Sequence, residues 1–151
     1  MIVAGTGHRE QFCEDESIVR RKIRTALEYS GADTVISGMA SGFDLWLGDE
    51  AILLGIEVWA ARPWRKHSAG KSNNELYAQV LAGASEVINV IDQDKYPGVW
   101  VYHARDKWMV DHATHLLAYL NPAAESGGTF GTVKYARGKV PIRNIFEAPP
   151  Y

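Results

Sequence analysis

The fold is indicated most clearly by one stretch, which reads HLLAYL at residues 115–120, SGGTFGT at 126–132 and VKYA at 133–136. An apolar run, a glycine-rich turn and the start of a helix, in this order, are typical of a site where backbone N–H groups face an anion. Glycine has no Cβ, so the backbone at such a turn can approach a ligand closely. The stretch therefore predicts a phosphate-binding loop, with a plain turn as the alternative.

The same succession of strand, glycine loop and helix occurs twice more, earlier in the chain. MIVA at residues 1–4 leads into GTGHR at 5–9, and TVI at 34–36 leads into SGMASG at 37–42. Further strands are predicted at 57–61, 87–91 and, as a short edge strand, 140–142. Helices are predicted at 14–29, 43–54, 74–81 and 103–113, and a last one after the third glycine loop.

This alternation predicts an α/β fold, a Rossmann-like, doubly wound, mostly parallel sheet with helices on both faces. The length of 151 residues fits one domain, 1–151. Right-handed crossovers place the loops that follow all the strands at one edge of the sheet. Ligands of such folds bind at that edge, where the strand order reverses. The three glycine loops are therefore expected to share one ligand site.

Composition limits the classes of function. Hydrophobic residues make up 46% of the chain, charged residues 23%, and the net charge is −2. This balance argues against non-specific nucleic-acid binding, which normally shows a basic excess. Cys13 is the single cysteine and has no partner for a disulfide, which fits a reducing cytoplasm. No apolar run is long enough to cross a bilayer, so we expect a cytoplasmic protein without a membrane partner.

The predicted ligand-binding residues come from the three loops and from the helix expected at 103–113. They are Gly5, Thr6, Gly7, His8, Arg9, Ser37, Gly38, Met39, Asp44, Arg105, Trp108, Gly127, Gly128, Thr129 and Thr132. Arg9 is suited to bidentate pairing with a phosphate, or else is a solvent-exposed loop residue. Asp44 either caps the helix that follows it or accepts hydrogen bonds from ribose hydroxyls.

Two cations, Arg105 and Lys107, fall in the first turn of the helix expected at 103–113, where the helix dipole disfavours them. This placement predicts contact with an anion, and solvation is the alternative for Lys107. Arg105 shares a helical face with Met109 and His112. Asp111 lies four residues after Lys107, so it either has a role in the site or forms an intrahelical ion pair with Lys107.

Aromatic and apolar residues give weaker signals. Trp108 is a core residue or a ligand contact, and the loop residues Trp64 and Trp100 either stack on a base or pack within the protein. Trp46 and Leu47 are expected as apolar surface residues that support a homo-oligomer. The histidines lack the ligand spacing of a metal site, and GTGHR lacks the third glycine of the dinucleotide fingerprint, so neither a metal nor a cofactor is predicted.

Five motifs in one order resemble the SLOG superfamily of Rossmann-like proteins. These motifs are GTGHR at 5–9, SGMASGFD at 37–44, PW at 63–64, RDKWMVD at 105–111 and GGT at 127–129. The superfamily includes the DNA-processing protein DprA/Smf, the Lonely Guy enzymes and the YpsA-like small proteins of bacteria and phages, and the YpsA-like branch is the most similar. The resemblance spans nearly the whole chain and implies a nucleotide or a nucleotide-derived ligand.

The Lonely Guy enzymes are phosphoribohydrolases that use an Arg on the fourth helix and a Glu after a PGGxGT motif. Arg105 matches that Arg, whereas Ser126 replaces the Pro and Val133 or Lys134 stands where the Glu belongs. The leading hypothesis is therefore binding of a nucleotide-like small molecule, such as an NAD-derived or cyclic-nucleotide signal. The first alternative is an N-glycoside hydrolase with Arg105, Asp111 and Asp44 as its catalytic residues. The second is a DprA-like DNA-binding helper, which the acidic balance disfavours.

Overall fold

The computed structural model describes residues 1–150, and residue 151, the last of the predicted domain 1–151, lies outside the described residues. The strands are β1 (Ile2–Gly7), β2 (Thr34–Ser37), β3 (Glu57–Trp64), β4 (Glu86–Ile91), β5 (His115–Tyr119) and β6 (Ile142–Asn144). The helices are α1 (Glu16–Ser30), α2 (Phe43–Leu53), α3 (Asn74–Gly83), α4 (Trp100–Asp111) and α5 (Gly128–Ala136), with 3-10 turns η1 (Glu10–Phe12) and η2 (Lys71–Asn73). The predicted fold class is confirmed.

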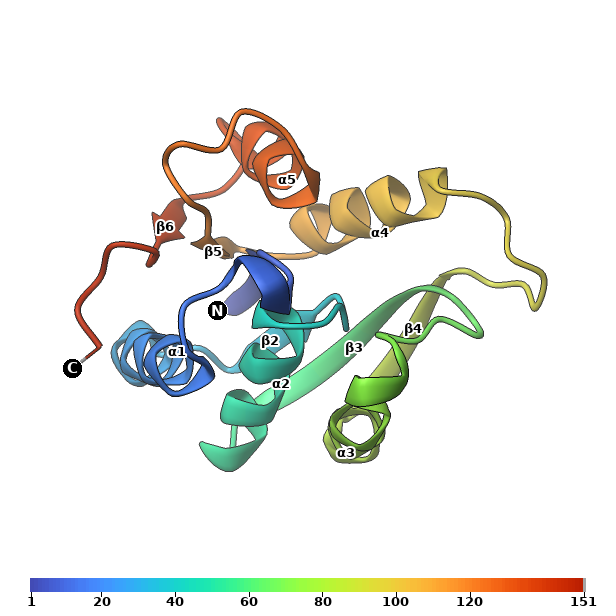
Figure 1. Cartoon of the computed structure of the whole chain (residues 1–151), viewed down its shortest axis with the longest axis horizontal. Helices are drawn as coiled ribbons and strands as arrows, with labels where there is room; N and C mark the ends of the chain where they lie inside the picture. The colour runs from blue at the N-terminus through green and yellow to red at the C-terminus, as the bar shows by residue number, and fades with distance from the viewer. Residues whose placement is uncertain (151) are drawn as a thin grey trace.

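Within residues 1–150 the six strands are all parallel and lie in the order β4-β3-β2-β1-β5-β6 (Figure 1). The chain builds the sheet outward from β1 to β4, then returns to the other side of β1 with β5. Strand order therefore reverses between β1 and β5. In an open α/β sheet this reversal leaves a crevice outside the carboxyl ends of the two strands.

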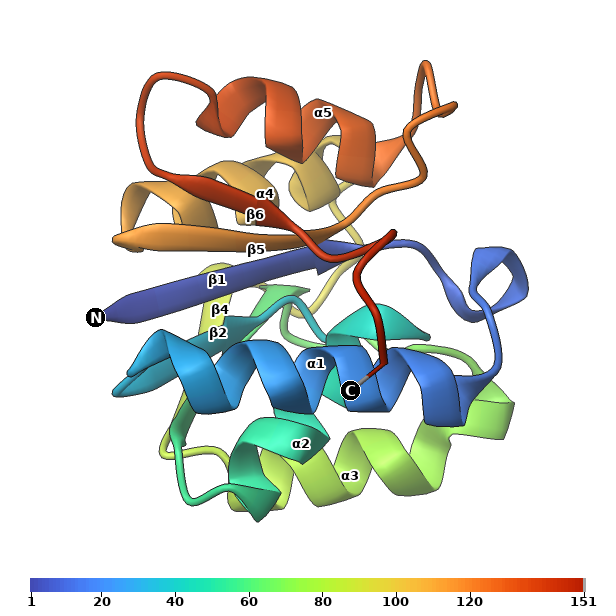
Figure 2. The same ribbon diagram turned by 90° about the vertical axis from the view of Figure 1, so that its left-hand side faces the viewer.

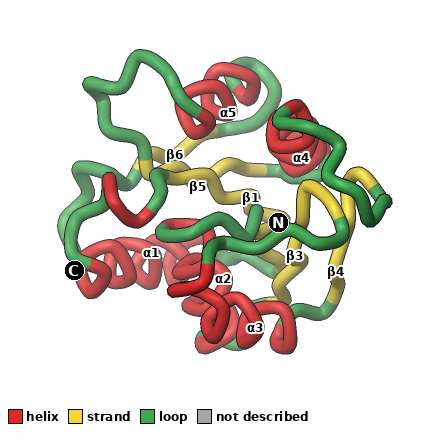
Figure 3. Tube along the Cα trace, turned by 45° about the vertical axis from the view of Figure 1, so that its right-hand side comes forward, coloured by secondary structure: helices red, strands yellow, loops and turns green. Residues whose placement is uncertain are grey.

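The two faces of the sheet carry different helices, as Figures 2 and 3 show. Side chains alternate along each strand, so Val3 and Val35 pack with α1 and α2, whereas Ala4 and Ile36 pack with α4 and α5. Helix α3 joins the first face through a small cluster that includes Tyr77. Both faces are thus covered, and ligand access is confined to the edges of the sheet and the ends of its strands.

Two predicted boundaries are wrong, and the second of them, at the start of α4, bears on the site. The edge strand predicted at 140–142 begins at Ile142, because Pro141 has no N–H to donate, and its carbonyl instead accepts from Leu116 N at 2.9 Å. Helix α4 begins at Trp100 rather than at residue 103. Arg105 therefore lies in the second turn of α4, and the argument from cations in a first turn does not hold.

The prediction that Trp46 and Leu47 are surface residues is also wrong. Their exposed fractions are 3% and 0%, because α2 is apolar on nearly all sides and packs against both α1 and the sheet. The homo-oligomer stays a prediction without these two residues. None of the helices in residues 1–150 has the length and apolar character that a bilayer crossing requires.

Candidate functional site

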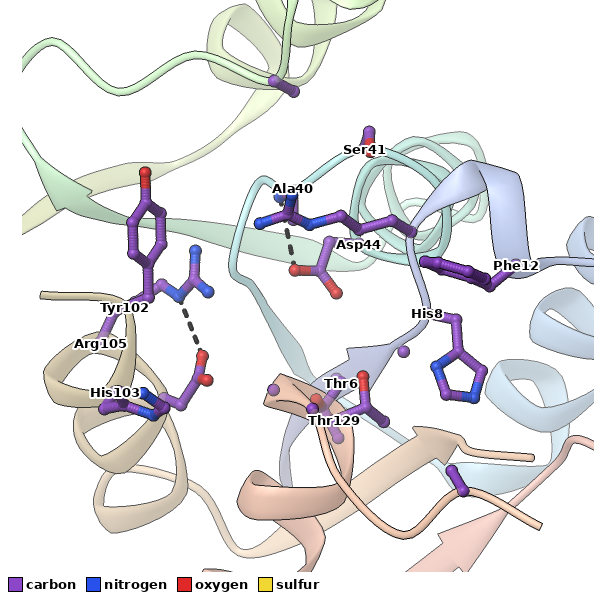
Figure 4. Close-up of a pocket in the computed structure, with 18 of the residues that line it drawn as sticks. Thr6, His8, Phe12, Ala40, Ser41, Asp44, Tyr102, His103, Arg105 and Thr129 are labelled. Atoms are coloured by element: carbon purple, nitrogen blue, oxygen red, sulfur yellow. Dashed lines mark hydrogen bonds and ion pairs between the residues drawn. The ribbon is translucent and has the colours of Figure 1, made fainter. Parts of the chain in front are cut away.

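A cleft of about 860 Å³ opens at the carboxyl ends of β1 and β5, where the strand order reverses (Figure 4). Loops after β1, β2, β3 and β5 surround it, together with α4 and the start of α5. Its lining residues are Gly5, Thr6, Gly7, His8, Arg9, Phe12, Ala40, Ser41, Asp44, His67, Ser68, Ala69, Gly70, Tyr102, His103, Arg105, Asp106, Asn121, Ala123, Ala124, Ser126, Gly127, Gly128 and Thr129. Ten of the predicted ligand-binding residues are among them.

Gly5 and Gly7 have a structural reason to be glycine that is separate from any ligand. A Cβ on Gly7 would lie 2.2 Å from Phe43 Cγ, and one on Gly5 would lie 2.0 Å from Leu47 Cδ2. These two glycines let β1 approach α2 closely, and that contact places the loop after β1 beside the start of α2. Their small size, expected to allow the approach of a ligand, instead serves packing.

His8 links the two strands at the reversal. Its backbone N–H donates to Tyr119 O at 3.3 Å, and its ring Nε2 accepts from the backbone N–H of Asn121 at 2.8 Å. Because Nε2 is an acceptor, the ring proton of neutral His8 sits on Nδ1. Burial lowers the pKa of His8, so the neutral form prevails. His8 therefore offers one N–H donor at the cleft.

The start of α5 presents unpaired backbone donors to the cleft. Gly127 precedes the helix with a φ of +103°, and no acidic residue stands in the first turn. Within residues 1–150 the N–H groups of Gly128, Thr129 and Phe130 have no hydrogen-bond acceptor. A Cβ at Gly127 or Gly128 would meet no atom within 4 Å. This loop has the open space and the donors that an anion site requires.

Asp44 brings a buried carboxyl group to the cleft from the first turn of α2. Its Oδ2 accepts from the backbone N–H of Ala40 at 3.4 Å, while Oδ1 has no partner among the described residues. Loss of hydration raises the pKa of Asp44 to about 7, although the positive charge of Arg105 acts in the opposite direction. A carboxyl that titrates near neutrality and lacks a partner is typical of functional sites.

Ser37, Gly38 and Met39 lie behind Asp44 and do not line the cleft. Ser37 Oγ donates to Asp44 O at 2.7 Å and accepts from Met39 N at 3.2 Å. Met39 is fully buried and has a φ of +65°, an uncommon conformation for a residue with a side chain. A Cβ on Gly38 would lie 2.8 Å from Asp44 Oδ2 and 3.2 Å from Arg105 Nε. These predicted ligand contacts instead hold Asp44 and Arg105 in place.

Arg105 projects from α4, lines the cleft and is 6% exposed. Its Nη1 donates to Gly38 O at 2.7 Å, and its Nε donates to Asp106 Oδ1 at 3.0 Å. The guanidinium also lies 5.7 Å from the centre of the Tyr102 ring. These contacts fix its orientation, and Figure 4 shows it on the side of the cleft opposite His8. An oriented, buried guanidinium is suited to binding an anionic oxygen.

The loop between β3 and α3 forms a wall that the sequence analysis missed. His67 is 7% exposed, its Nδ1 lies 3.1 Å from the Tyr77 hydroxyl oxygen, and its ring meets the Tyr102 ring edge to face. Burial, together with the positive charges of Arg105, Arg62 and Arg9, lowers the pKa of His67 to about 3. The surrounding cations indicate a positive potential at this end of the cleft. No glycine motif marks the loop, so the sequence carried no signal for it.

Three further predicted residues lie outside the cleft lining. Trp108 stacks on His112 with ring centres 4.0 Å apart and packs on the core beneath α4. Thr132 Oγ1 donates to Gly128 O at 2.8 Å, so it braces the start of α5. Asp111 is exposed and accepts from the Tyr135 hydroxyl at 2.7 Å rather than pairing with Lys107. Each is turned away because its position on the helix faces the core or the solvent.

The loop tryptophans are also outside the lining. Trp64 ends β3 and meets the Tyr96 ring edge to face, and Trp100 starts α4 and donates its Nε1–H to Pro97 O at 3.1 Å. The aromatic rings in the cleft wall are instead those of Phe12, Tyr102 and the histidines His8, His67 and His103. Across residues 1–150, no three His, Cys, Asp or Glu side chains gather closely enough to hold a metal ion.

Comparison with known proteins places these features among Rossmann-like proteins. No known protein-family profile matches the chain. The UPF0398 protein lin2003 of Listeria innocua is 27% identical over 117 residues, which cover 74% of this chain and 64% of that protein. The chain therefore spans somewhat less than two thirds of the length of that curated relative.

Two solved structures share the fold at low sequence identity. DNA processing protein A of Helicobacter pylori, described as binding single-stranded DNA, has a TM-score of 0.72 and 15% identity, covering 94% of this chain and 63% of its own. The molybdenum cofactor carrier protein of Chlamydomonas reinhardtii has a TM-score of 0.60 and 14% identity, covering 93% and 73%. Together with the curated relative, these likenesses fit the SLOG superfamily that the five motifs resemble.

Proposed function

We propose that this protein, whose fold and relatives fit the SLOG superfamily of Rossmann-like proteins, binds a nucleotide or a nucleotide-derived ligand in the cleft at the carboxyl ends of β1 and β5. The observation that carries the proposal is the start of α5, where free backbone N–H groups open into the same cleft as a buried arginine. Free helix N-terminal donors favour a phosphate, and an oriented guanidinium adds a second anionic contact.

The remaining cleft groups suit the other parts of such a ligand. Asp44 offers a carboxylate oxygen without a protein partner, which matches the hydroxyl groups of a ribose. Arg9 is exposed and lines the cleft, where its guanidinium is suited to pairing with a phosphate. The solved neighbours bind single-stranded DNA or carry a cofactor, so the fold alone does not select the ligand. The net charge of −2 supports a small ligand over DNA.

Hydrolysis of the N-glycosidic bond is the second candidate, and one observation favours it. Asp44 has a pKa of about 7 and lies close to Arg105 in the same cleft. A carboxyl group that titrates at working pH can pass a proton to a leaving base. Asp111, the other predicted acid, is exposed, lies outside the cleft lining and takes no part in this version.

The test of binding is a ligand panel with thermal shift and product analysis in the same samples. The panel holds nucleoside monophosphates, NAD, ADP-ribose and cyclic nucleotides, and a ligand bound only by the folded state raises the melting temperature. Arg105→Ala should weaken binding by about tenfold or more, because a charge-assisted contact is lost. Lys107→Ala is the matched control, since Lys107 is exposed on the same helix and outside the cleft lining.

Each outcome separates the candidates. Stabilisation with an intact ligand supports a binding protein, and release of a free base that Asp44→Asn abolishes supports a hydrolase. Equal ligand binding by Arg105→Ala and by the unsubstituted chain would place the site elsewhere. Location in the cytoplasm and assembly into a homo-oligomer stay predictions from the sequence.

A further inference from the structure

Phe12 is an apolar side chain left uncovered at the edge of the cleft. It ends η1 and is 68% exposed, yet it belongs to the cleft lining. Other large apolar side chains exposed in residues 1–150 lie outside that lining: Met1, Tyr29, Leu53, Leu54, Val87, Tyr96, Val99 and Trp100. Phe12 is therefore distinguished by its place, beside charged and polar groups that suit a phosphorylated ligand.

The backbone under Phe12 is firmly held. Phe12 N donates to Arg9 O at 2.9 Å, and the Cys13 thiol donates to His8 O at 3.3 Å. The turn also packs closely against the loop before α2. A Cβ on Gly42 would come within 2.4 Å of Glu10 N. Phe12 is thus an exposed ring on an ordered turn. A ligand that covers this ring therefore does not have to order the backbone beneath it.

The positions of the other groups define what lies beside the ring. Figure 4 shows Phe12 and His8 on one side of the cleft, Tyr102 and Arg105 on the opposite side, and Thr129 apart from both. Asp44 lies between the two sides. A flat apolar group on Phe12 would therefore continue, by way of Asp44, toward the donors at the start of α5. Nucleotides have this succession of base, sugar and phosphate.

We propose that Phe12 is the base-stacking residue of this cleft, so that the ligand carries an aromatic base against η1 and its phosphate at the start of α5. This proposal rests on the proposed function and adds the orientation of the ligand. Stacking on an aromatic side chain covers the exposed ring and tolerates different bases, because every base has a π face. The Nδ1–H of His8 is the nearby donor for an edge of the base.

The experiment measures dissociation constants by calorimetry for AMP, GMP, UMP and ribose 5-phosphate. Phe12→Ala should weaken the binding of the three nucleotides by about 5- to 150-fold, which is the range for loss of one stacked base. It should leave ribose 5-phosphate unchanged, because that probe has no base. Phe12→Trp should keep nucleotide affinity. Val99→Ala is the matched control, since Val99 is 69% exposed and lies outside the cleft lining.

The outcomes distinguish base stacking on Phe12 from nucleotide binding in the cleft, the proposed function on which it rests. If the unsubstituted chain binds nucleotides and Phe12→Ala binds them equally well, base stacking on Phe12 is refuted and nucleotide binding stands. If Phe12→Ala weakens ribose 5-phosphate as much as AMP, the residue supports the turn rather than the base, and the proposal is again refuted. If the unsubstituted chain binds no nucleotide, both proposals fall.

Discussion

The first glycine loop (residues 5–9), which includes the end of β1, and the third (residues 126–132), which includes the start of α5, contain glycines with different roles. A Cβ on Gly7 would lie 2.2 Å from Phe43, whereas a Cβ on Gly127, Gly128 or Gly131 would meet nothing within 4 Å. The first loop needs glycine so that β1 can pack on α2. The third has open space in front of it, on the side of the cleft. Similar sequence motifs therefore serve packing in one place and access in the other.

Both loops contribute groups to the cleft. Close packing of β1 on α2 holds Asp44 and the turn that carries Phe12 at the cleft. The open loop supplies free N–H groups at the start of α5. Substitutions at or beside the packed loop should therefore change stability first, and substitutions in the open loop should change binding first.

The largest effect on the free energy of unfolding is expected from Asp44, whose carboxyl group is buried near the first glycine loop. Asp44 has a pKa of about 7 in the folded chain and an ordinary value of 3.8 when unfolded. Between these values the folded state keeps a proton that the unfolded state has lost, so stability falls as pH rises from about 4 to 7. Asp44→Asn should remove this fall, which amounts to about 4 kcal/mol.

Urea unfolding at pH 4, 6 and 8 checks this expectation. The difference in unfolding free energy between Asp44→Asn and the unsubstituted chain should move in favour of the variant as pH rises. Glu125→Gln is the control, because Glu125 is an exposed carboxylate next to the open loop. A difference that stays constant across this pH range would mean that Asp44 titrates normally and is not desolvated.

Gly7→Ala tests the packing role directly. The new methyl group would overlap Phe43, whose ring is fully buried and cannot move aside freely. We expect a loss of about 3 kcal/mol in unfolding free energy, the upper part of the range for overpacking. Denaturant unfolding measures it. Gly5→Ala should cost less, since its closest neighbour is the end of the flexible Leu47 side chain. Full stability in Gly7→Ala would remove the contrast between the two loops.

Gly128→Ala tests the open loop. The methyl group has free space in the unliganded protein, so the melting temperature should stay the same or rise slightly. It would stand where a phosphate approaches the free N–H groups, and nucleotide affinity should fall roughly tenfold, equal to about 1.4 kcal/mol. Calorimetry with AMP and thermal unfolding of the same sample separate the two effects. Unchanged affinity would show that the phosphate of the nucleotide does not bind at this loop.

Gly131→Ala gives the smallest expected change and a sign opposite to that of Gly7→Ala. Gly131 lies within α5, has open space around it and does not line the cleft. Alanine should therefore stabilise the protein by about 0.5–1 kcal/mol, the difference in helix propensity, with no effect on binding. Thermal unfolding in the presence and absence of ligand measures both. Destabilisation would reveal a packing role that the open geometry does not account for.

The sequence by itself determined the α/β class and the edge of the sheet where the cleft lies. Apolar runs separated by amphipathic helices are local patterns, and the parallel topology that they imply brings the three glycine loops to one edge. Arg9 and Asp44 were predicted from charged residues that follow a strand or begin a helix, whereas Arg105 was predicted from a first-turn position that it does not occupy and from its match to the Arg of the Lonely Guy enzymes. All three line the cleft.

Only the tertiary structure decided which residues line the cleft. Whether a glycine serves packing or access depends on what lies opposite it, and Phe43 and Leu47 oppose Gly7 and Gly5 from a distant part of the chain. His67 and Phe12 carry no motif and reach the cleft because their loops fold over it. The pKa of Asp44 likewise follows from its removal from water, which is a property of the assembled core and not of neighbouring residues in the sequence.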